Sequence, residues 1–276
     1  MRASRVHDTA EFLERTLAMR TADPVHLNVI GSVATGVLQG RTYDELHWFL
    51  IEDDDGTVVG AGAWTVPYHV LVSPMPDDAA HELGRLLAAL PTPPVAVVGP
   101  PDVCFGVAAG SGFTPKVAMR ERILVLGEFT PAVGVPGVAR PPADDDDVEL
   151  AVEWTVQFAQ DADAELDDPR QSAESRLPGM LFWEVDGEPV AMASHAPLVT
   201  TPAGTVARIG PVFTAREHRR RGYGAAVTSA VVASVLDRPS TIMLFADAAN
   251  PTSNGVYERL GFAMVDEILD VDLLRP

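Results

Sequence analysis

The sequence has 276 residues, 47% of them hydrophobic, which is enough for two domains with real cores or for one large domain. Its formal net charge of −19 argues against a protein that binds nucleic acid or an anionic membrane surface. An acidic surface can attract cationic substrates such as amines, but it is equally consistent with a role in solubility alone.

The cysteine content and the first residues bear on the cellular compartment. Cys104 is the single cysteine, so the chain forms no internal disulfide, which fits a reducing cytoplasm. Its apolar neighbours indicate a small core residue rather than a nucleophile. Residues 1–6 lack the apolar core of a signal peptide, and no apolar run is long enough to span a bilayer. We therefore expect a cytoplasmic protein with no membrane partner.

The first half of the chain mixes helical and strand patterns. Asp8 can cap an amphipathic segment, with Glu11 where a capping box requires it. Asp55 and Gly56 lie between two β-rich runs and predict the turn of a hairpin. The predicted helices of this half cover 8–20, 24–39, 77–90 and 103–109, and the predicted strands cover 48–52, 57–67, 95–98 and 116–126.

A segment rich in proline and glycine, 127–137, predicts a junction between two domains, with ranges 1–128 and 133–276. The acidic run 144–147 offers four carboxylates, but consecutive residues of an exposed turn point in different directions. We predict no metal site there, and solvated caps at the positive end of the next helix. Further helices are predicted at 148–159, 169–177, 225–236 and from Asn250 to Gly261, and strands at 181–185, 190–195, 206–213, 241–246 and 263–273.

The hairpin predicted in the second half repeats the one in the first. The parallel segments are 49–52 with 181–184, 58–61 with 189–192, and 111–113 with 260–262. A repeat on this scale suggests two copies of one fold rather than a solenoid.

The most informative stretch, 209–226, joins a strand-like run to a helix rich in alanine and valine. Between them lies a loop with three consecutive arginines followed by Gly222, Tyr223 and Gly224. Such a loop brings backbone N–H groups to the start of a helix, whose unpaired donors and partial positive charge suit a phosphate. The glycines allow the main chain to approach an anion closely, and the arginines add charge. The alternative is a basic turn without a ligand.

This loop resembles the coenzyme-A-binding motif of the GNAT superfamily of N-acetyltransferases, Arg/Gln-x-x-Gly-x-Gly/Ala, with Arg219, Gly222 and Gly224 in register. Downstream, Asn254-x-x-Tyr257 and the Gly-Phe at 261–262 resemble the family's second coenzyme-contacting helix. The resemblance covers about the last half of the chain. It implies an α/β (α+β) fold with two GNAT-like domains, each a central mixed, mostly antiparallel sheet flanked by helices.

The first copy departs from the family motif. Where the phosphate loop should lie, the chain has residues 73–78, which end in two aspartates instead of arginines. Carboxylates there would repel a pyrophosphate, so we expect the first copy not to bind coenzyme A.

The resemblance implies acetyl-CoA as the acetyl donor and backbone contacts from 212–214 to its pantetheine arm. Proline cannot donate to a ladder, so Gly210-Pro211 predicts a bulge or a parted strand edge that leaves N–H groups free to polarise a carbonyl. Tyr257 resembles the family's general acid, which protonates the departing thiolate; its alternative role is a buried aromatic. The predicted coenzyme-binding residues are Val212, Phe213, Thr214, Arg219, Arg220, Arg221, Gly222, Tyr223, Gly224, Ala225, Asn250, Ser253 and Asn254.

The general base is not evident, because 206–213 holds no carboxylate where some relatives carry a glutamate. Glu217 and Glu258 are not placed by any motif. His195 can serve as the general base, because the ordinary pKa of histidine lies near neutral pH, although a lone histidine on a strand is more often structural. Water, or an amine that arrives in its neutral form, can serve equally well.

The sequence thus predicts an acetyl-CoA-dependent N-acetyltransferase that acts by direct attack in a ternary complex. Its acceptor would be a small-molecule or peptide amine, with no nucleic-acid partner. The alternative is a non-catalytic acyl-CoA-binding or regulatory module.

Overall fold

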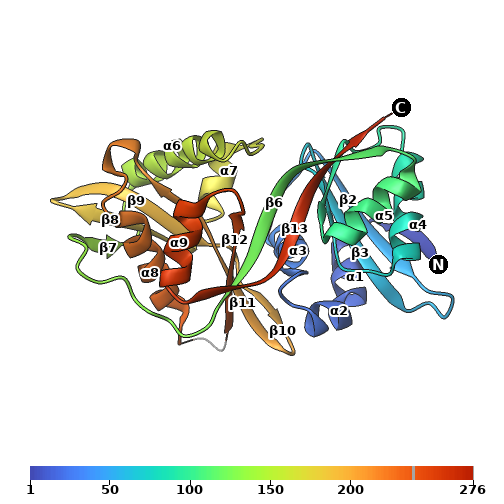
Figure 1. Ribbon diagram of the computed structural model, residues 1–276, viewed down its shortest axis with the longest axis horizontal. Helices are drawn as coiled ribbons and strands as arrows, with labels where there is room; N and C mark the ends of the chain where they lie inside the picture. The colour runs from blue at the N-terminus through green and yellow to red at the C-terminus, as the bar shows by residue number, and fades with distance from the viewer. Residues whose placement is uncertain (238–239, 276) are drawn as a thin grey trace.

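The computed structural model describes residues 1–237 and 240–275, so the last residue of the predicted range 133–276 lies outside the described residues. Within the described ranges, the strands form a thirteen-stranded sheet flanked by helices. Figure 1 shows two halves, joined by the long strands β6 (Thr114–Leu126) and β13 (Phe262–Leu274), which run from one half into the other.

The first half contains β1 (Arg2–Val6), α1 (Thr9–Arg15), α2 (Leu17–Ala22), α3 (Asn28–Leu38), β2 (Glu45–Glu52), β3 (Val58–Val66), β4 (Val70–Val72), α4 (Asp77–Ala88), β5 (Ala96–Gly99) and α5 (Pro101–Ser111), followed by β6. The second half contains β7 (Val138–Arg140), α6 (Asp145–Asp161), α7 (Pro169–Glu174), the 3₁₀ turn η1 (Leu177–Gly179), β8 (Met180–Val185), β9 (Glu188–His195), β10 (Val199–Thr201), β11 (Gly204–Thr214), the 3₁₀ turn η2 (Arg216–His218), α8 (Tyr223–Val235), β12 (Ser240–Asp247) and α9 (Pro251–Arg259), followed by β13.

The two halves repeat one topology. Each has an antiparallel hairpin, β2–β3 or β8–β9, and a parallel pair of strands, β4–β5 or β11–β12, connected by a helix, α4 or α8. The β8–β9 turn places Asp186 at φ +52° and Gly187 at φ +84°, as a type I′ hairpin turn requires. The fold is therefore mixed α/β with a mostly antiparallel sheet in each half.

The two halves exchange their last strands. Strand β13 pairs with β6 from residue 262 to residue 274, and its residues 269–272 also pair, on their other edge, with β5 of the first half. Reciprocally, residues 121–125 of β6 pair with β12 of the second half. The strand order is consequently β1-β2-β3-β4-β5-β13-β6-β12-β11-β9-β8-β7, with β10 beside β11. The ranges 1–128 and 133–276 stay a prediction for domain boundaries, but neither range alone holds a complete sheet.

Several elements differ from those predicted. The helix expected over 8–20 is divided at Thr16 into α1 and α2, although Asp8 caps α1 as predicted, with its Oδ1 2.7 Å from the backbone nitrogen of Glu11. The strands β1, β4, β7 and β10 were not predicted. Three of them have three residues each, too few to show an alternating pattern.

The helices of the second half cover both faces of its sheet. One apolar cluster joins α8 and α9 to the strands through Val227, Leu244 and Tyr257. On the opposite face, α6 and α7 pack on β8, β9 and β11 through a cluster that includes Trp154 and Phe213. Within the described ranges, every helix is too short or too polar to cross a membrane.

The acidic run before α6 differs from the prediction of four solvated caps. Asp144 is the N-cap of α6, and its Oδ1 accepts a hydrogen bond from the Asp147 nitrogen at 3.0 Å. Asp147, however, is 6% exposed and accepts from Arg140 Nη1 at 2.6 Å and Nη2 at 2.9 Å. Strand β7 delivers this arginine, so the prediction was wrong for Asp147. No cluster of metal-ligating side chains occurs in the described part of the chain.

We expect Asp147→Ala to lower the free energy of unfolding by about 2 kcal/mol, because Arg140 loses its bidentate partner and keeps only Glu184, and the Ala143 N–H loses its acceptor. Arg140 holds the pKa of Asp147 below its usual value. The ion pair therefore stabilises the fold fully above the ordinary pKa of aspartate, and this stabilisation is lost as the pH falls through the lowered pKa of Asp147. Urea unfolding at neutral pH measures the loss. The exposed neighbour supplies the control, and Asp146→Ala should cost less than about 1 kcal/mol. Equal losses would contradict the role of the ion pair.

Candidate functional site

The strands β11 and β12 pair in parallel along residues 205–208 and 240–243 and then separate. Beyond this point β11 pairs with β9, and β12 pairs with β6. The register of β11 shifts between Ile209 and Val212, at Gly210-Pro211, where the strands part. The bulge and the parted edge predicted from this dipeptide are both confirmed.

The parted edge of β11 carries backbone donors. Ala215 donates its N–H to the Val190 carbonyl at 3.1 Å, so that residue faces β9. Because alternate residues of an antiparallel ladder direct their N–H groups to opposite edges, the N–H groups of Val212 and Thr214 face the gap between β11 and β12. The side chain of Phe213, by contrast, is buried against Trp154, with 5.7 Å between the rings.

The loop between η2 and α8 directs backbone donors to the start of the helix. Gly222 is the N-cap at φ +86°, and Arg220 also has a left-handed backbone at φ +64°. This turned backbone forms a concave set of N–H groups of the kind that binds anions. The N–H groups of Tyr223, Gly224 and Ala225 open α8 and have no acceptor within the helix. A Cβ on Gly224 would lie 3.2 Å from Thr214 Oγ1, so this position has little room for a side chain.

The three arginines of the loop have different roles. Arg219 donates its Nε to the Thr214 carbonyl at 3.0 Å and forms an ion pair with Asp161 of α6, which Arg216 also contacts at 2.8 Å. These contacts anchor the loop to α6 and lower the pKa of Asp161. Arg220 and Arg221 are exposed, and neither forms an ion pair with any described residue. Arg219 thus positions the loop, while Arg220 and Arg221 remain available to an anion.

Helix α9 borders the gap on the side of β12. Asn250 caps it as predicted, with its Oδ1 3.1 Å from the Ser253 nitrogen. Asn254 is buried and donates its Nδ2 to the Asp247 carbonyl at 3.0 Å, which ties α9 to the end of β12. Its Oδ1 is buried and has no hydrogen-bond partner among the described residues. That acceptor is available to an amide N–H of a ligand.

Tyr257 lies one turn after Asn254, and its ring is 6.1 Å from that of Phe262. Burial raises the pKa of Tyr257 to about 12, so the phenol stays protonated at neutral pH. Its hydroxyl makes no hydrogen bond with a described residue. The side chain is therefore a packed aromatic whose hydroxyl stays protonated.

The face of the sheet opposite α8 and α9 carries charged residues that the sequence did not suggest. Side chains two apart on a strand share a face, so Arg208 lies on the face of Val206, and Glu121 lies on that of Ile123. Burial raises the pKa of Glu121, whereas the charge of Arg208 lowers it. Arg176, which precedes η1, donates to the Gly210 carbonyl at 2.9 Å.

Of the general bases considered from the sequence, His195 lies opposite Ile209, next to the bulge of β11. The His195 Nδ1 is 2.8 Å from the Ala196 carbonyl, and the ring packs over the Gly179 backbone, which is a structural role. Glu217 and Glu258 are exposed, and Glu258 lies 3.7 Å from Arg122. Glu121 was missed because it belongs to the first half of the chain and reaches this sheet only through the strand exchange.

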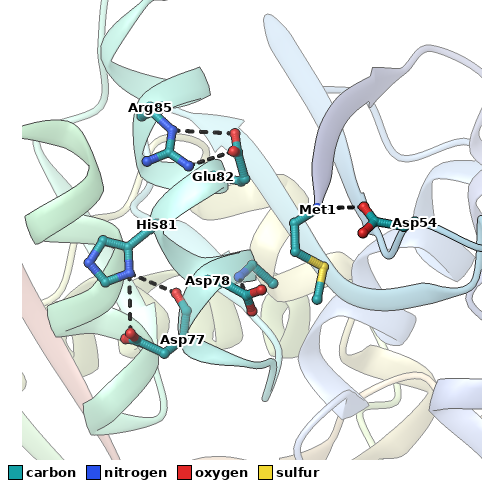
Figure 2. A network of polar contacts seen from close by, with 8 residues as sticks. Met1, Asp54, Asp77, Asp78, His81, Glu82 and Arg85 are labelled. Carbon is teal, nitrogen blue, oxygen red and sulfur yellow. Dashed lines mark hydrogen bonds and ion pairs between the residues drawn. The ribbon is translucent and has the colours of Figure 1, made fainter.

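The corresponding place in the first half is closed. Figure 2 shows Asp77 and Asp78 at the start of α4, where His81 Nδ1 donates to the Asp77 carbonyl at 2.8 Å. The next helix packs directly on α4, since a Cβ on Gly84 would lie 2.2 Å from the backbone oxygen of Val107. This contact and the acidic residues support the prediction that the first half binds no coenzyme A.

Comparisons with known proteins agree with this geometry. Residues 148–262 match the model of the acetyltransferase (GNAT) family. Among curated proteins, none matches this sequence. An acetyltransferase of the GNAT family from Colwellia psychrerythraea superposes with a TM-score of 0.64 at 10% identity, and the match covers 99% of this chain and 100% of that one.

Two further solved structures share the fold over nearly the whole chain. A GCN5-related N-acetyltransferase from Sphaerobacter thermophilus has a TM-score of 0.56 at 16% identity, covering 99% of this chain and 96% of its own. A tandem GNAT protein from the clavulanic acid biosynthesis pathway has a TM-score of 0.55 at 16% identity, covering 98% and 97%. The chain thus has the fold of tandem GNAT proteins, and its residues 148–262 match the model of the GNAT family of acetyltransferases.

Proposed function

We propose that the protein transfers an acetyl group from acetyl-CoA to an amine by direct attack in a ternary complex. The observation that carries this proposal is the concave N–H loop at the start of α8, placed beside the gap between β11 and β12. The loop fits a diphosphate, since Gly222 and Gly224 leave the backbone open and Arg220 and Arg221 add charge. The buried Oδ1 of Asn254 fits an amide of the pantetheine arm.

Each chemical need of acyl transfer has a residue near the gap. The donor supplies an activated thioester. The N–H groups of Val212 and Thr214 are placed to polarise its carbonyl, as in an oxyanion hole. Tyr257 can give a proton to the leaving sulfur, because its phenol is protonated at neutral pH.

Glu121 is the general base in this proposal. Burial raises its pKa above that of an ordinary glutamate, which makes the ionised carboxylate a stronger base. The amine nitrogen forms a bond to the acetyl carbon as the carbon–sulfur bond breaks. The amine loses one proton and the sulfur gains one, so the reaction needs no further reactant.

The alternative is a non-catalytic acyl-CoA-binding module. Such a module needs the loop but neither Tyr257 nor a base. The absence of a carboxylate on β11 favours this alternative. Glu121 weakens it, because β6 brings this carboxylate to the face of the same sheet opposite α8 and α9.

Calorimetry with acetyl-CoA, followed by a thiol-release assay on an amine panel, tests the proposal. We expect one acetyl-CoA per chain, because the first half is closed between α4 and α5, and we expect free thiol only when an amine is present. Absence of binding would contradict the proposal entirely. Binding without thiol release for any amine would favour the non-catalytic module, and two sites per chain would show that the first half is open.

A further inference from the structure

We infer that the acceptor is a small amine that also carries a carboxylate, which binds a cluster of three arginines between the two halves of the chain. The cluster consists of Arg41, Arg176 and Arg208. The inference rests on the proposed function, because the cluster lies on the face from which an acceptor would approach the gap between β11 and β12.

The three side chains come from distant segments and lie close enough for their charges to act on one another. Arg208 lies on β11 just before the bulge and reaches α3 of the first half, with Nε 3.0 Å from Asn28 Oδ1. Arg176 donates to the carbonyl of Gly210, inside the bulge. Arg41, which follows α3, donates its Nε to Gln171 Oε1 of α7 at 3.2 Å. Both halves of the chain therefore build this cluster.

No carboxylate of the described residues forms an ion pair with the cluster, although the charge of Glu121 acts on Arg208 from a longer distance. No described carboxylate lies within 4.0 Å of any of these three guanidinium groups, whereas eight of the fifteen other arginines in the described ranges have such a partner. A guanidinium has several N–H donors in a planar fork, and here the acceptors that the protein supplies are a carbonyl, a hydroxyl and two side-chain amides. Many donors are thus left for a ligand.

The electrostatics agree with the geometry. Burial and the neighbouring charges of Arg208 and Arg41 lower the pKa of Arg176 to about 9. Burial and the charge of Arg41 lower the pKa of Arg208 to about 10, although the charge of Glu121 raises this pKa. Buried like charges without a partner cost free energy, and a carboxylate relieves that cost by accepting bidentate hydrogen bonds.

An orphaned donor lies beside the cluster. Asn28 is 1% exposed, and its Oδ1 accepts from Arg208, which leaves its Nδ2 as the donor. This Nδ2 is buried and has no partner among the residues that the structure describes. A buried amide N–H beside these guanidinium groups also needs a hydrogen-bond acceptor, and a carboxylate oxygen can supply one.

A pocket of about 170 Å³ adjoins the cluster and limits the size of the acceptor. The pocket is lined by Arg41, Tyr43 and Tyr68 of the first half and by Gln171 of the second, so it too lies between the halves. Its volume is below the roughly 300–1,000 Å³ of drug-sized sites, which favours a small acceptor over a protein terminus. The rim also holds Asp44, Asp167 and Asp168.

These rim carboxylates and the net charge of −19 would repel a simple anion. A zwitterion meets both conditions, because its ammonium group tolerates the acidic rim while its carboxylate binds the arginines. Once inside, its nitrogen must reach the gap near Glu121 and lose a proton there. An amino acid, with its two charged groups close together, fits this arrangement.

Kinetics of the wild-type protein with matched acceptors test the inference. The panel pairs each small α-amino acid with its α-carboxamide and with the amine that remains without the carboxylate. We expect kcat/KM for the best amino acid to exceed that of its two analogues by on the order of 100-fold, because the analogues leave buried charges unpaired. Equal values would overturn the inference and leave the acetyltransferase proposal standing. Failure of every amine would overturn both.

Variants separate acceptor binding from a structural role. We expect Arg176→Gln to raise KM for the amino acid by about tenfold or more, with little change in KM for its carboxamide. The affinity for acetyl-CoA and the melting temperature serve as controls for folding. Arg85→Gln, which breaks an exposed ion pair with Glu82 far from the gap, should change none of these values. An equal loss for amino acid and carboxamide would show that Arg176 only holds the bulge, and would count against the inference.

Discussion

Replacing Gly222 with aspartate should lower the affinity for acetyl-CoA by about 100-fold or more. The residue is the N-cap of α8 at φ +86°, in the centre of the concave N–H loop. A carboxylate there would oppose a diphosphate, and like charges in contact cost several kcal/mol. Each factor of ten in affinity corresponds to about 1.4 kcal/mol. Calorimetric titration with acetyl-CoA measures the loss.

The chain offers a matched control at Gly187. This glycine has almost the same backbone, at φ +84°, and a Cβ added to it would meet no atom within 4 Å. Gly187→Asp therefore imposes similar backbone strain in the β8–β9 turn, away from the loop, and should leave the affinity unchanged. If Gly222→Asp bound acetyl-CoA as tightly as Gly187→Asp, the loop would not be the phosphate site.

The elements predicted correctly are those that depend on local signals. Asn250 and Pro251 mark the start of α9, because a capping side chain and a proline at the first helical position act on their own residues. The same holds for the loop before α8, where the glycines and the arginines are adjacent in the chain. The loop proposed to bind the coenzyme was therefore visible in the sequence.

The acceptor side was not visible, because it depends on contacts between distant segments. Glu121 reaches the sheet of the second half through the exchange of β6, and Arg208 meets Asn28, 180 positions away in the chain. No periodicity or spacing relates such residues. Asp147 was misjudged for a similar reason, since its partner Arg140 lies on a three-residue strand that has no sequence signal of its own.

The strand exchange gives the first half a role although it lacks the loop. Without β6, β12 would end the second sheet as an exposed edge beside the gap. Without α3, Arg208 would lose its hydrogen bonds to Asn28 and Ser32. The first half thus completes the sheet and builds the proposed acceptor face, while the loop proposed to bind the coenzyme lies wholly in the second half.

Replacing Glu121 with glutamine should lower kcat on the order of 100-fold at neutral pH, the usual contribution of a general base. Glutamine has nearly the same shape, and β6 keeps its pairing with β12 through the backbone, so the affinity for acetyl-CoA should not change. Glu258→Gln provides the control, because that carboxylate is exposed on α9 and should retain wild-type turnover.

The pH profile and the stability of Glu121→Gln make the prediction sharper. Burial raises the pKa of Glu121, so wild-type activity should fall at low pH around a pKa above the ordinary glutamate value, and this limb should vanish in the variant. A raised pKa also means that the ionised side chain costs stability at neutral pH, so the variant should unfold at the same or a higher temperature. A residue that only supports the fold would show the reverse, with lost stability and an unchanged acid limb. That outcome would remove Glu121 from the mechanism and leave water or the neutral amine to manage the proton.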